Sequence, residues 1–258
     1  MSGALVTGAG SRLGRAMALY LAGRGHDVVV HFSASEMGAQ DTVSACCALG
    51  VRAVALKADL LDEAAVADLI PRANEAIGGL NVLVNNASIF EYDNVATATP
   101  DSWDRHIGSN LRAPFFLTQA FADQADLAGR DSAGEPIAQS LIVNMIDQRV
   151  KKLTPEFMTY TIAKMGLWAM TQTTARALAP AIRVNAIAPG PTLQGAHQTA
   201  EHFAHQRAAT VLGRGSNSED ITAALGYFLD APSVTGQMIA VDGGQHLGWK
   251  TPDIQSAE

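Results

Sequence analysis

A phenol and an ammonium group lie four residues apart in the segment Tyr160-Thr-Ile-Ala-Lys164, a spacing that predicts one shared face of a helix. Tyrosine has a pKa of about 10, so it exchanges protons near neutral pH only when a positive charge lies nearby. A carboxylate, Asp147, ends the strand-like segment 140–147 upstream of this pair. These three side chains could together move a proton to or from a substrate.

Asp147 indicates which hydrogen-bonding groups the substrate carries. An ionised carboxylate cannot donate a hydrogen bond to a carbonyl oxygen, but it accepts hydrogen bonds from ring N–H groups, amino groups or Tyr160. If it is protonated, it could pass on a proton itself. Asp147 therefore favours a nitrogenous substrate over a simple ketone. The alternative is a strand-end aspartate that only caps the following turn.

Strand-like apolar runs alternate with helix-length segments, and these elements must position the three side chains. The expected strands are 4–7, 27–32, 53–57, 81–85, 139–145, 183–188 and 238–241. The expected helices are 12–24, 36–49, 62–77, 101–127, 154–178 and 218–229. This alternation predicts an α/β fold, a single domain over residues 1–258 with a Rossmann-type doubly wound, seven-stranded parallel sheet and helices on both faces.

Two stretches interrupt the alternation. Residues 128–136 are rich in Gly and Ser and end at a proline, which predicts a surface loop. Residues 189–214 follow the sixth strand and are too long for an ordinary connection, so we expect them to cover the substrate. We call residues 189–214 the lid segment, and a merely structural insertion is the alternative.

The segment Thr7-Gly-Ala-Gly-Ser-Arg-Leu-Gly14 lies between the first strand and the first helix. Glycines allow a tight turn there, and backbone donors at the helix N-terminus can hold a pyrophosphate. The sequence therefore predicts a dinucleotide cofactor that contacts Gly8, Arg12, Leu13 and Gly14.

The end of the second strand predicts which nicotinamide dinucleotide binds. An acidic residue there would bind ribose hydroxyls and repel a 2′-phosphate, but no acidic residue occurs before Glu36. Arg12 could instead reach the 2′-phosphate, with hydrogen bonds from Ser33 and Ser35. This favours NADPH or NADP over NAD, and the alternative is that Arg12 is only a surface charge.

Polar residues also follow the third and fourth strands. Asp59 could accept the adenine amino group, and the segment Asn86-Ala87-Ser88 could line the ribose and nicotinamide. Asp and Asn also favour strand-end turns for local reasons, so each residue alone is a weak signal.

Together, Thr7–Gly14, Asn85–Ala87, Asn110, the Tyr160/Lys164 pair and Pro189-Gly190 resemble the short-chain dehydrogenase/reductase family over essentially the whole chain. The resemblance implies that Tyr160 donates or accepts the proton, that Lys164 lowers the tyrosine pKa and binds the nicotinamide ribose, and that Asn110 holds a proton-relay water. It also implies cofactor contacts from Pro189, Gly190 and Thr192. A homotetramer built through the helices Asn110–Phe121 and Tyr160–Leu178 is expected on the same basis.

Most members of this family carry a serine where Asp147 stands. The segments Asn144-Met-Ile-Asp147 and Asn86-Ala-Ser-Ile-Phe90 are similar to the pteridine reductase branch, which includes dihydromonapterin reductases. That likeness implies reduction of a C=N bond in a dihydropterin-like ring, with Phe90 covering one face of the pterin and nicotinamide the other. The expected substrate contacts are Ser88, Phe90, Pro191, Asp147 and Tyr160. Ala34 departs from the branch, which carries a basic residue there, and Phe90 could alternatively be a core residue.

Composition excludes several other functions. The net charge is −7 and the 18 basic residues are scattered, so we expect no nucleic-acid partner. We found no apolar run of membrane-spanning length and no secretory signal, and therefore expect a cytoplasmic protein without a membrane partner. No metal site is predicted. The remaining alternatives to a pterin reductase are a carbonyl reductase or alcohol dehydrogenase, and a non-catalytic dinucleotide sensor.

Overall fold

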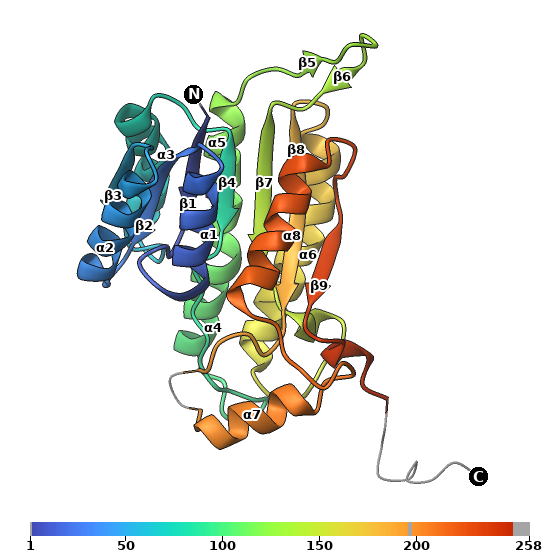
Figure 1. The fold of residues 1–258 in the computed structure, drawn as a ribbon. Coiled ribbons are helices and arrows are strands. Elements are labelled where there is room, and N and C mark those ends of the chain that lie inside the picture. The colour runs from blue at the N-terminus through green and yellow to red at the C-terminus, as the bar shows by residue number, and fades with distance from the viewer. Residues whose placement is uncertain (1, 196–197, 250–258) are drawn as a thin grey trace.

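Seven parallel strands form the central sheet of the computed structural model, which describes residues 2–195 and 198–249 (Figure 1). The strands are β1 (Gly3–Val6), β2 (Asp27–Phe32), β3 (Ala53–Lys57), β4 (Val82–Asn85), β7 (Ser140–Met145), β8 (Ile182–Pro189) and β9 (Met238–Val241). They pair in the order β3-β2-β1-β4-β7-β8-β9, and every neighbouring pair is parallel. The predicted fold class is confirmed.

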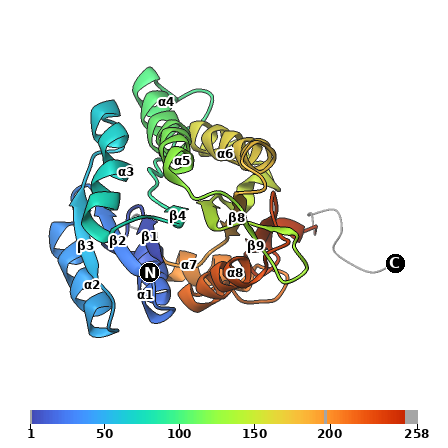
Figure 2. The same ribbon diagram turned by 90° about the horizontal axis from the view of Figure 1, so that it is seen from above.

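Helices cover both faces of this sheet (Figure 2). One face packs against α1 (Arg12–Gly23), α2 (Glu36–Ala48) and α8 (Ser218–Asp230). The other packs against α3 (Glu63–Ile77), α5 (Ala113–Gln124) and α6 (Met158–Ala177). Parallel strands buried on both faces need apolar residues at nearly every position, which explains the continuous apolar runs in the sequence.

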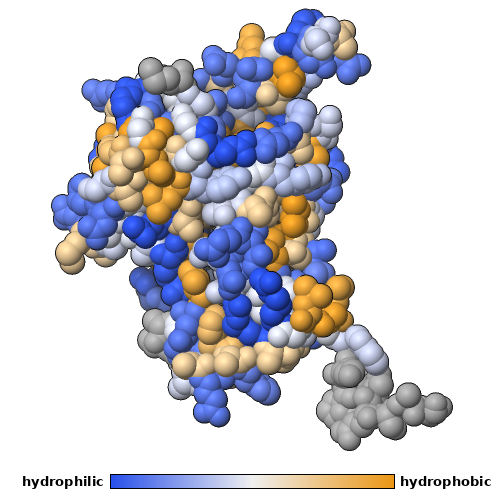
Figure 3. All heavy atoms as spheres, viewed as in Figure 1, coloured by the Kyte–Doolittle hydropathy of each residue, from blue (hydrophilic) through white to orange (hydrophobic). Residues whose placement is uncertain are grey.

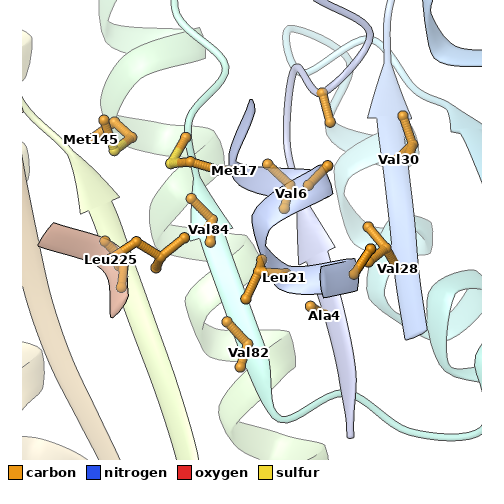
Figure 4. Packing of buried hydrophobic residues seen from close by; sticks show 14 of the residues in the cluster. Ala4, Val6, Met17, Leu21, Val28, Val30, Val82, Val84, Met145 and Leu225 are labelled. Carbon is orange, nitrogen blue, oxygen red and sulfur yellow. The ribbon is translucent and has the colours of Figure 1, made fainter. Parts of the chain in front are cut away.

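Successive residues of β1 face opposite sides of the sheet, as strand geometry requires. Ala4 and Val6 lie in one buried cluster with Met17 and Leu21 of α1, whereas Leu5 lies in the cluster on the other face (Figure 4). All five side chains are fully buried. Burying one Val or Leu side chain stabilises the fold by about 1.5–3 kcal/mol, so this register is strongly specified.

The predicted helix 101–127 is divided in the structure. It consists of α4 (Pro100–Ile107), a π-helical turn (Gly108–Arg112) and α5. Pro114 has no N–H to donate to the carbonyl oxygen of Asn110, so the α-helical hydrogen-bond ladder is interrupted there. The wider turn contains Asn110, one of the predicted catalytic residues.

The predicted helix 154–178 begins four residues later than expected, at Met158. Pro155 disfavours a helical backbone at Thr154, and Phe157 adopts a left-handed conformation with φ of 54° and ψ of 48°. The expected start was therefore wrong, while Tyr160 and Lys164 lie together on α6, as predicted.

Two small elements occupy the stretches that interrupt the alternation. β5 (Gly129–Arg130) and β6 (Pro136–Ile137) form an antiparallel hairpin at the edge of the sheet opposite the carboxyl ends of the strands (Figure 1). Helix α7 (Ala200–Ala208) lies within the lid segment, below the carboxyl ends in the same view. Thr199 caps α7 by accepting a hydrogen bond from the His202 amide.

On the face drawn in Figure 3, hydrophilic residues predominate and apolar residues form separate patches. Across residues 2–195 and 198–249, the helices are all too short or too polar to cross a membrane. The same residues contain no group of three or more His, Cys, Asp or Glu side chains that could hold a metal ion.

Candidate active site

A cavity of about 450 Å³ lies at the carboxyl ends of the parallel strands. It brings together most of the predicted site residues, namely Gly8, Arg12, Leu13, Gly14, Asn86, Ala87, Ser88, Phe90, Asp147, Tyr160, Lys164, Pro189, Gly190 and Thr192. Its lining also includes four residues that sequence reasoning missed: Ser11, Met145, Ile146 and Leu193. Within the described part of the chain, the predicted residues Ser33, Ser35, Asp59, Asn110 and Pro191 lie outside the lining.

The glycine turn between β1 and α1 is closely packed. Gly8 has φ of 64°, and a Cβ atom at Gly14 would collide with the Gly8 carbonyl oxygen. The Thr7 hydroxyl accepts hydrogen bonds from the amides of Asn86 (2.8 Å) and Ala87 (2.9 Å). The turn is thus joined to the residues after β4, and both segments line the cavity.

His31, in β2, supports this turn and was missed by sequence reasoning. Its Nδ1 accepts a hydrogen bond from the Gly8 amide at 3.0 Å, so Nε2 carries the proton and donates to the Ala58 carbonyl at 3.1 Å. Burial lowers the pKa of His31 to about 4, which keeps the ring neutral. A histidine within an otherwise apolar strand was the available signal.

Arg12 lies at the mouth of the cavity with φ of 52°. Its guanidinium donates to the carbonyl oxygens of Gln194 (2.9 Å) and Leu193 (3.2 Å) in the lid segment. In this arrangement Arg12 joins the glycine turn to the lid segment. Its role toward a 2′-phosphate stays a prediction.

The other residues predicted to contact the adenosine part of the cofactor are exposed. Ser33 and Ser35 lie in the exposed connection between β2 and α2. Asp59 is also exposed, and its carboxylate accepts a hydrogen bond from the Leu61 amide at 3.0 Å. Asp59 therefore stabilises the local turn, as strand-end aspartates commonly do, and its contact with adenine stays a prediction.

At the other end of the cavity, the end of β7 meets the start of α6. The Tyr160 hydroxyl donates to Asp147 Oδ2 at 3.0 Å, and Asp147 Oδ1 accepts a hydrogen bond from the Arg149 amide at 2.8 Å. The Lys164 ammonium donates to the Met145 carbonyl at 2.8 Å and lies 5.6 Å from the centre of the Tyr160 ring. The three predicted proton-transfer side chains therefore converge.

The pKa values of this cluster follow from burial and mutual charge. Burial raises the pKa of Tyr160 well above its ordinary value, and the charge of Asp147 raises it further. Burial also raises the pKa of Asp147, and it lowers the pKa of Lys164 to about 8. The net shift of the Tyr160 pKa is thus upward, chiefly through burial, and the expected lowering effect of Lys164 stays a prediction. At neutral pH Tyr160 keeps its proton.

Asn110 holds the segment after β4. Its Oδ1 accepts a hydrogen bond from the Ile89 amide at 2.9 Å, and its Nδ2 donates to the Ile89 carbonyl at 2.8 Å. Asn110 is fully buried. In this structure its amide positions the residue next to Phe90, and its predicted role with a relay water stays a prediction.

Phe90 lines the cavity and is 50% exposed, which excludes the alternative of a core phenylalanine. Its ring stacks on Phe157, with ring centres 4.4 Å apart and planes 6° apart, and lies edge-on to Tyr160 at 4.7 Å. The guanidinium of Arg149 lies 4.7 Å from the centre of the Phe157 ring. Phe157 and Arg149 were missed, since their contacts depend on the left-handed turn before α6.

The lid segment is anchored by Arg207 of α7. Its guanidinium donates to the Pro191 carbonyl at 2.9 Å and to Asn217 Oδ1 at 2.9 Å. Thr192 donates to the Gly190 carbonyl at 3.1 Å, and its hydroxyl also bonds to Ser216. Pro191 is buried and contributes its backbone to this anchoring.

Known proteins resemble this chain over nearly its full length. The family described as enoyl-(acyl carrier protein) reductase matches residues 8–246. L-rhamnose 1-dehydrogenase (NAD(P)(+)) from Sphingomonas sp. (strain SKA58) is 33% identical over 251 residues, which cover 94% of this chain and 95% of that protein.

Two solved structures are similar in both fold and sequence. FolM alternative dihydrofolate reductase 1 from Brucella canis, complexed with NADP, has a TM-score of 0.90 and 40% identity, covering 98% of this chain and 97% of that one. A short chain dehydrogenase from Burkholderia cenocepacia J2315, in complex with NADP, has a TM-score of 0.84 and 31% identity, covering 95% and 97%.

Substitution of Gly14 tests the glycine turn. Gly14→Ala places a Cβ against the Gly8 carbonyl oxygen and should weaken NADPH binding by about 10-fold or more, since the turn must open to accept it. Fluorescence titration with NADPH measures the effect. Gly23→Ala is the matched control in the same helix, because a Cβ there meets open space, and equal affinities in the two variants would contradict the prediction.

Asp147→Asn tests the electrostatics of the cluster. The predicted roles give reduction a protonated Tyr160 and a charged Lys164, so kcat/KM should fall as pH rises through about 8, where Lys164 loses its proton. Asp147 raises the pKa of both neighbours, so removing its charge lowers both pKa values and moves this alkaline limb to lower pH. A pH–rate profile that matches that of the exposed control Asp104→Asn would contradict the assignment.

Proposed function

The chain belongs to the short-chain dehydrogenase/reductase family and is an oxidoreductase, and on that premise we propose that it uses NADPH to reduce a C=N bond of a dihydropterin-like ring. The observation that carries this proposal is the hydrogen bond from Tyr160 to Asp147 inside the cavity. A carboxylate at this position accepts hydrogen bonds from ring N–H and amino groups, which a pterin ring offers and a simple ketone does not.

The cofactor half of the proposal rests on the glycine turn and its surroundings. Gly8, Gly14 and the start of α1 face the cavity, where backbone donors suit a pyrophosphate. Exposed serines, Ser33 and Ser35, follow β2 in place of an acidic residue that would repel a 2′-phosphate. The similar Brucella and Burkholderia structures both hold NADP. These observations support NADPH over NADH.

The aromatic wall supports a planar substrate. Phe90 exposes half of its surface and is backed by Phe157, so its ring plane is fixed from behind. A flat heterocycle between Phe90 and the nicotinamide would gain about 0.5–1.5 kcal/mol from ring contact beyond the area that it buries. The similar FolM structure is called an alternative dihydrofolate reductase, which is consistent with a pterin-type ring.

The proton chemistry follows from the geometry. Bound NADPH would supply a hydride to the carbon of the C=N bond. Tyr160 keeps its proton at neutral pH because burial and Asp147 raise its pKa, and it gives that proton to the ring nitrogen directly or through Asp147. Lys164 keeps a positive charge next to the tyrosine ring and compensates the developing phenolate charge.

A carbonyl substrate is the second candidate. Tyr160 and Lys164 would serve a ketone equally well, and the similar L-rhamnose 1-dehydrogenase is named for a sugar substrate. Asp147 would then be a local variant. A non-catalytic dinucleotide sensor is less well supported, because Tyr160, Asp147 and Lys164 converge on the cavity that would hold the nicotinamide.

We also propose that the lid segment covers bound substrate and that the chain forms a homotetramer. The lid segment borders the cavity through Gly190, Thr192 and Leu193. Large apolar residues are exposed on the two helices expected to meet in a tetramer, including Phe115 and Phe116 on α5 and Ile162 on α6. Burying such side chains between subunits would be favourable.

A substrate panel monitored by NADPH absorbance tests the function. Dihydropterins should be reduced faster than ketones, and Tyr160→Phe should lower turnover about 10²- to 10⁴-fold because the proton donor is lost. Tyr227→Phe, at an exposed tyrosine, is the control. Asp147→Ser should shift preference toward ketones. Unchanged pterin kinetics in Asp147→Ser would remove Asp147 from the mechanism.

A further inference from the structure

Three polar side chains from separate segments are buried beside Tyr160. Asp93 lies in the loop after β4, His106 lies near the end of α4, and Thr159 lies in the first turn of α6. Their exposed fractions are 2%, 0% and 3%. Buried polar groups are costly unless they are hydrogen-bonded, so this cluster needs an explanation.

Asp93 caps the helix that carries Tyr160. Its Oδ1 accepts a hydrogen bond from the Thr159 amide at 3.1 Å, and its Oδ2 accepts hydrogen bonds from the hydroxyls of Thr159 and Ser102. The Asp93 carbonyl also accepts one from the Phe157 amide at 2.7 Å. Phe157 occupies the N-cap position and has no polar side-chain atom, so a residue from a distant loop caps α6 instead.

His106 joins this cap to the loop that carries Phe90. Its Nε2 accepts a hydrogen bond from the Glu91 amide at 3.1 Å, and its Nδ1 lies 2.7 Å from the Thr159 hydroxyl oxygen. The Thr159 hydroxyl donates its proton to Asp93, so its oxygen accepts from His106. His106 is therefore neutral with its proton on Nδ1, and one imidazole links both segments.

The link fixes Tyr160 and Phe90 relative to each other. Thr159 directly precedes Tyr160, and the imidazole ring of His106 lies edge-on to the Tyr160 ring at 6.0 Å. Phe90 lies between Ile89, which Asn110 holds, and Glu91, which His106 holds. The side chain that gives the proton and the ring that covers the substrate are thus set by shared contacts.

We infer that Asp93, His106 and Thr159 are positioning residues that hold the Tyr160 phenol and the Phe90 ring in register for proton transfer. The inference rests on the proposed roles of Tyr160 and Phe90. Misplacing a reacting group by about 1 Å can cost about 10²-fold in rate. Loss of a hydrogen-bonded cluster this close to Tyr160 should therefore affect turnover more than cofactor binding.

Thr159→Val tests this cluster because it removes the hydroxyl that bonds to Asp93 and His106 and keeps the shape of the side chain. Turnover of a dihydropterin should fall about 10- to 100-fold, while fluorescence titration still shows one NADPH bound per chain with unchanged affinity. Thr159→Ser restores the hydroxyl and should recover most of the loss. Thr171→Val is the matched control, since Thr171 is a fully buried threonine of α6 that bonds to Asn144.

Equal turnover in Thr159→Val and Thr171→Val would overturn the inference. So would a loss of turnover that merely tracks a loss of NADPH-binding chains, because that is the result of a purely structural role. Recovery in Thr159→Ser with full NADPH binding throughout supports positioning.

A second measurement needs no substrate and separates this inference from the proposed function. NMR of ¹⁵N-histidine-labelled protein should show His106 as the neutral Nδ1–H form, displaced in Thr159→Val and retained in Thr171→Val. Hydrogen exchange of the Glu91 amide should quicken in Thr159→Val alone. If the wild type reduces no dihydropterin, the substrate proposal fails, and these signals decide the positioning inference: unchanged His106 and Glu91 signals in Thr159→Val would overturn it.

Discussion

The hydrogen bond between Tyr160 and Asp147 joins the end of a strand to the start of a helix, and the chemistry that we propose for the cavity depends on it. Burial raises the pKa of the Tyr160 phenol and the charge of Asp147 raises it further, so the tyrosine is protonated at neutral pH. Burial lowers the pKa of Lys164 to about 8, and the charge of Asp147 acts in the opposite direction. The phenol therefore holds the proton that the proposed reduction would consume.

The parallel sheet brings these groups together because the carboxyl ends of its strands meet at one edge. The residues after β1 and β4 line one side of the cavity, where the Thr7 hydroxyl links the two segments. The end of β7 supplies Asp147, and the segment after β8 closes the other side. Two buried side chains outside the cavity hold these loops: His31 beneath the glycine turn and Asn110 beside Ile89. Each accepts a hydrogen bond from a backbone amide that apolar packing alone would leave unpaired.

Much of this could be predicted from the sequence. The apolar runs predicted all seven strands, the four-residue spacing predicted that Tyr160 and Lys164 share a helix face, and the family resemblance placed Asp147 beside them. Helix boundaries were harder to predict, although Pro114 and Pro155 were visible signals for the interruption near Asn110 and the late start of α6. The contacts of His31, His106 and Phe157 were beyond sequence reasoning, because each joins residues far apart in the chain through a particular tautomer or a left-handed backbone.

Arg12 contacts the lid segment through its guanidinium, so an anion that bound this guanidinium would compete with the lid segment for it. The guanidinium donors that hold the carbonyl oxygens of Leu193 and Gln194 are the same donors that the proposed contact with a 2′-phosphate would use. Thermodynamic linkage makes such competition reciprocal. Binding of the anion to Arg12 lowers the affinity of Arg12 for the lid segment by the same factor by which the lid segment lowers the affinity for the anion. A measured cofactor affinity would then already include the cost of releasing the segment, and shortening the segment would change that affinity without altering a single phosphate contact.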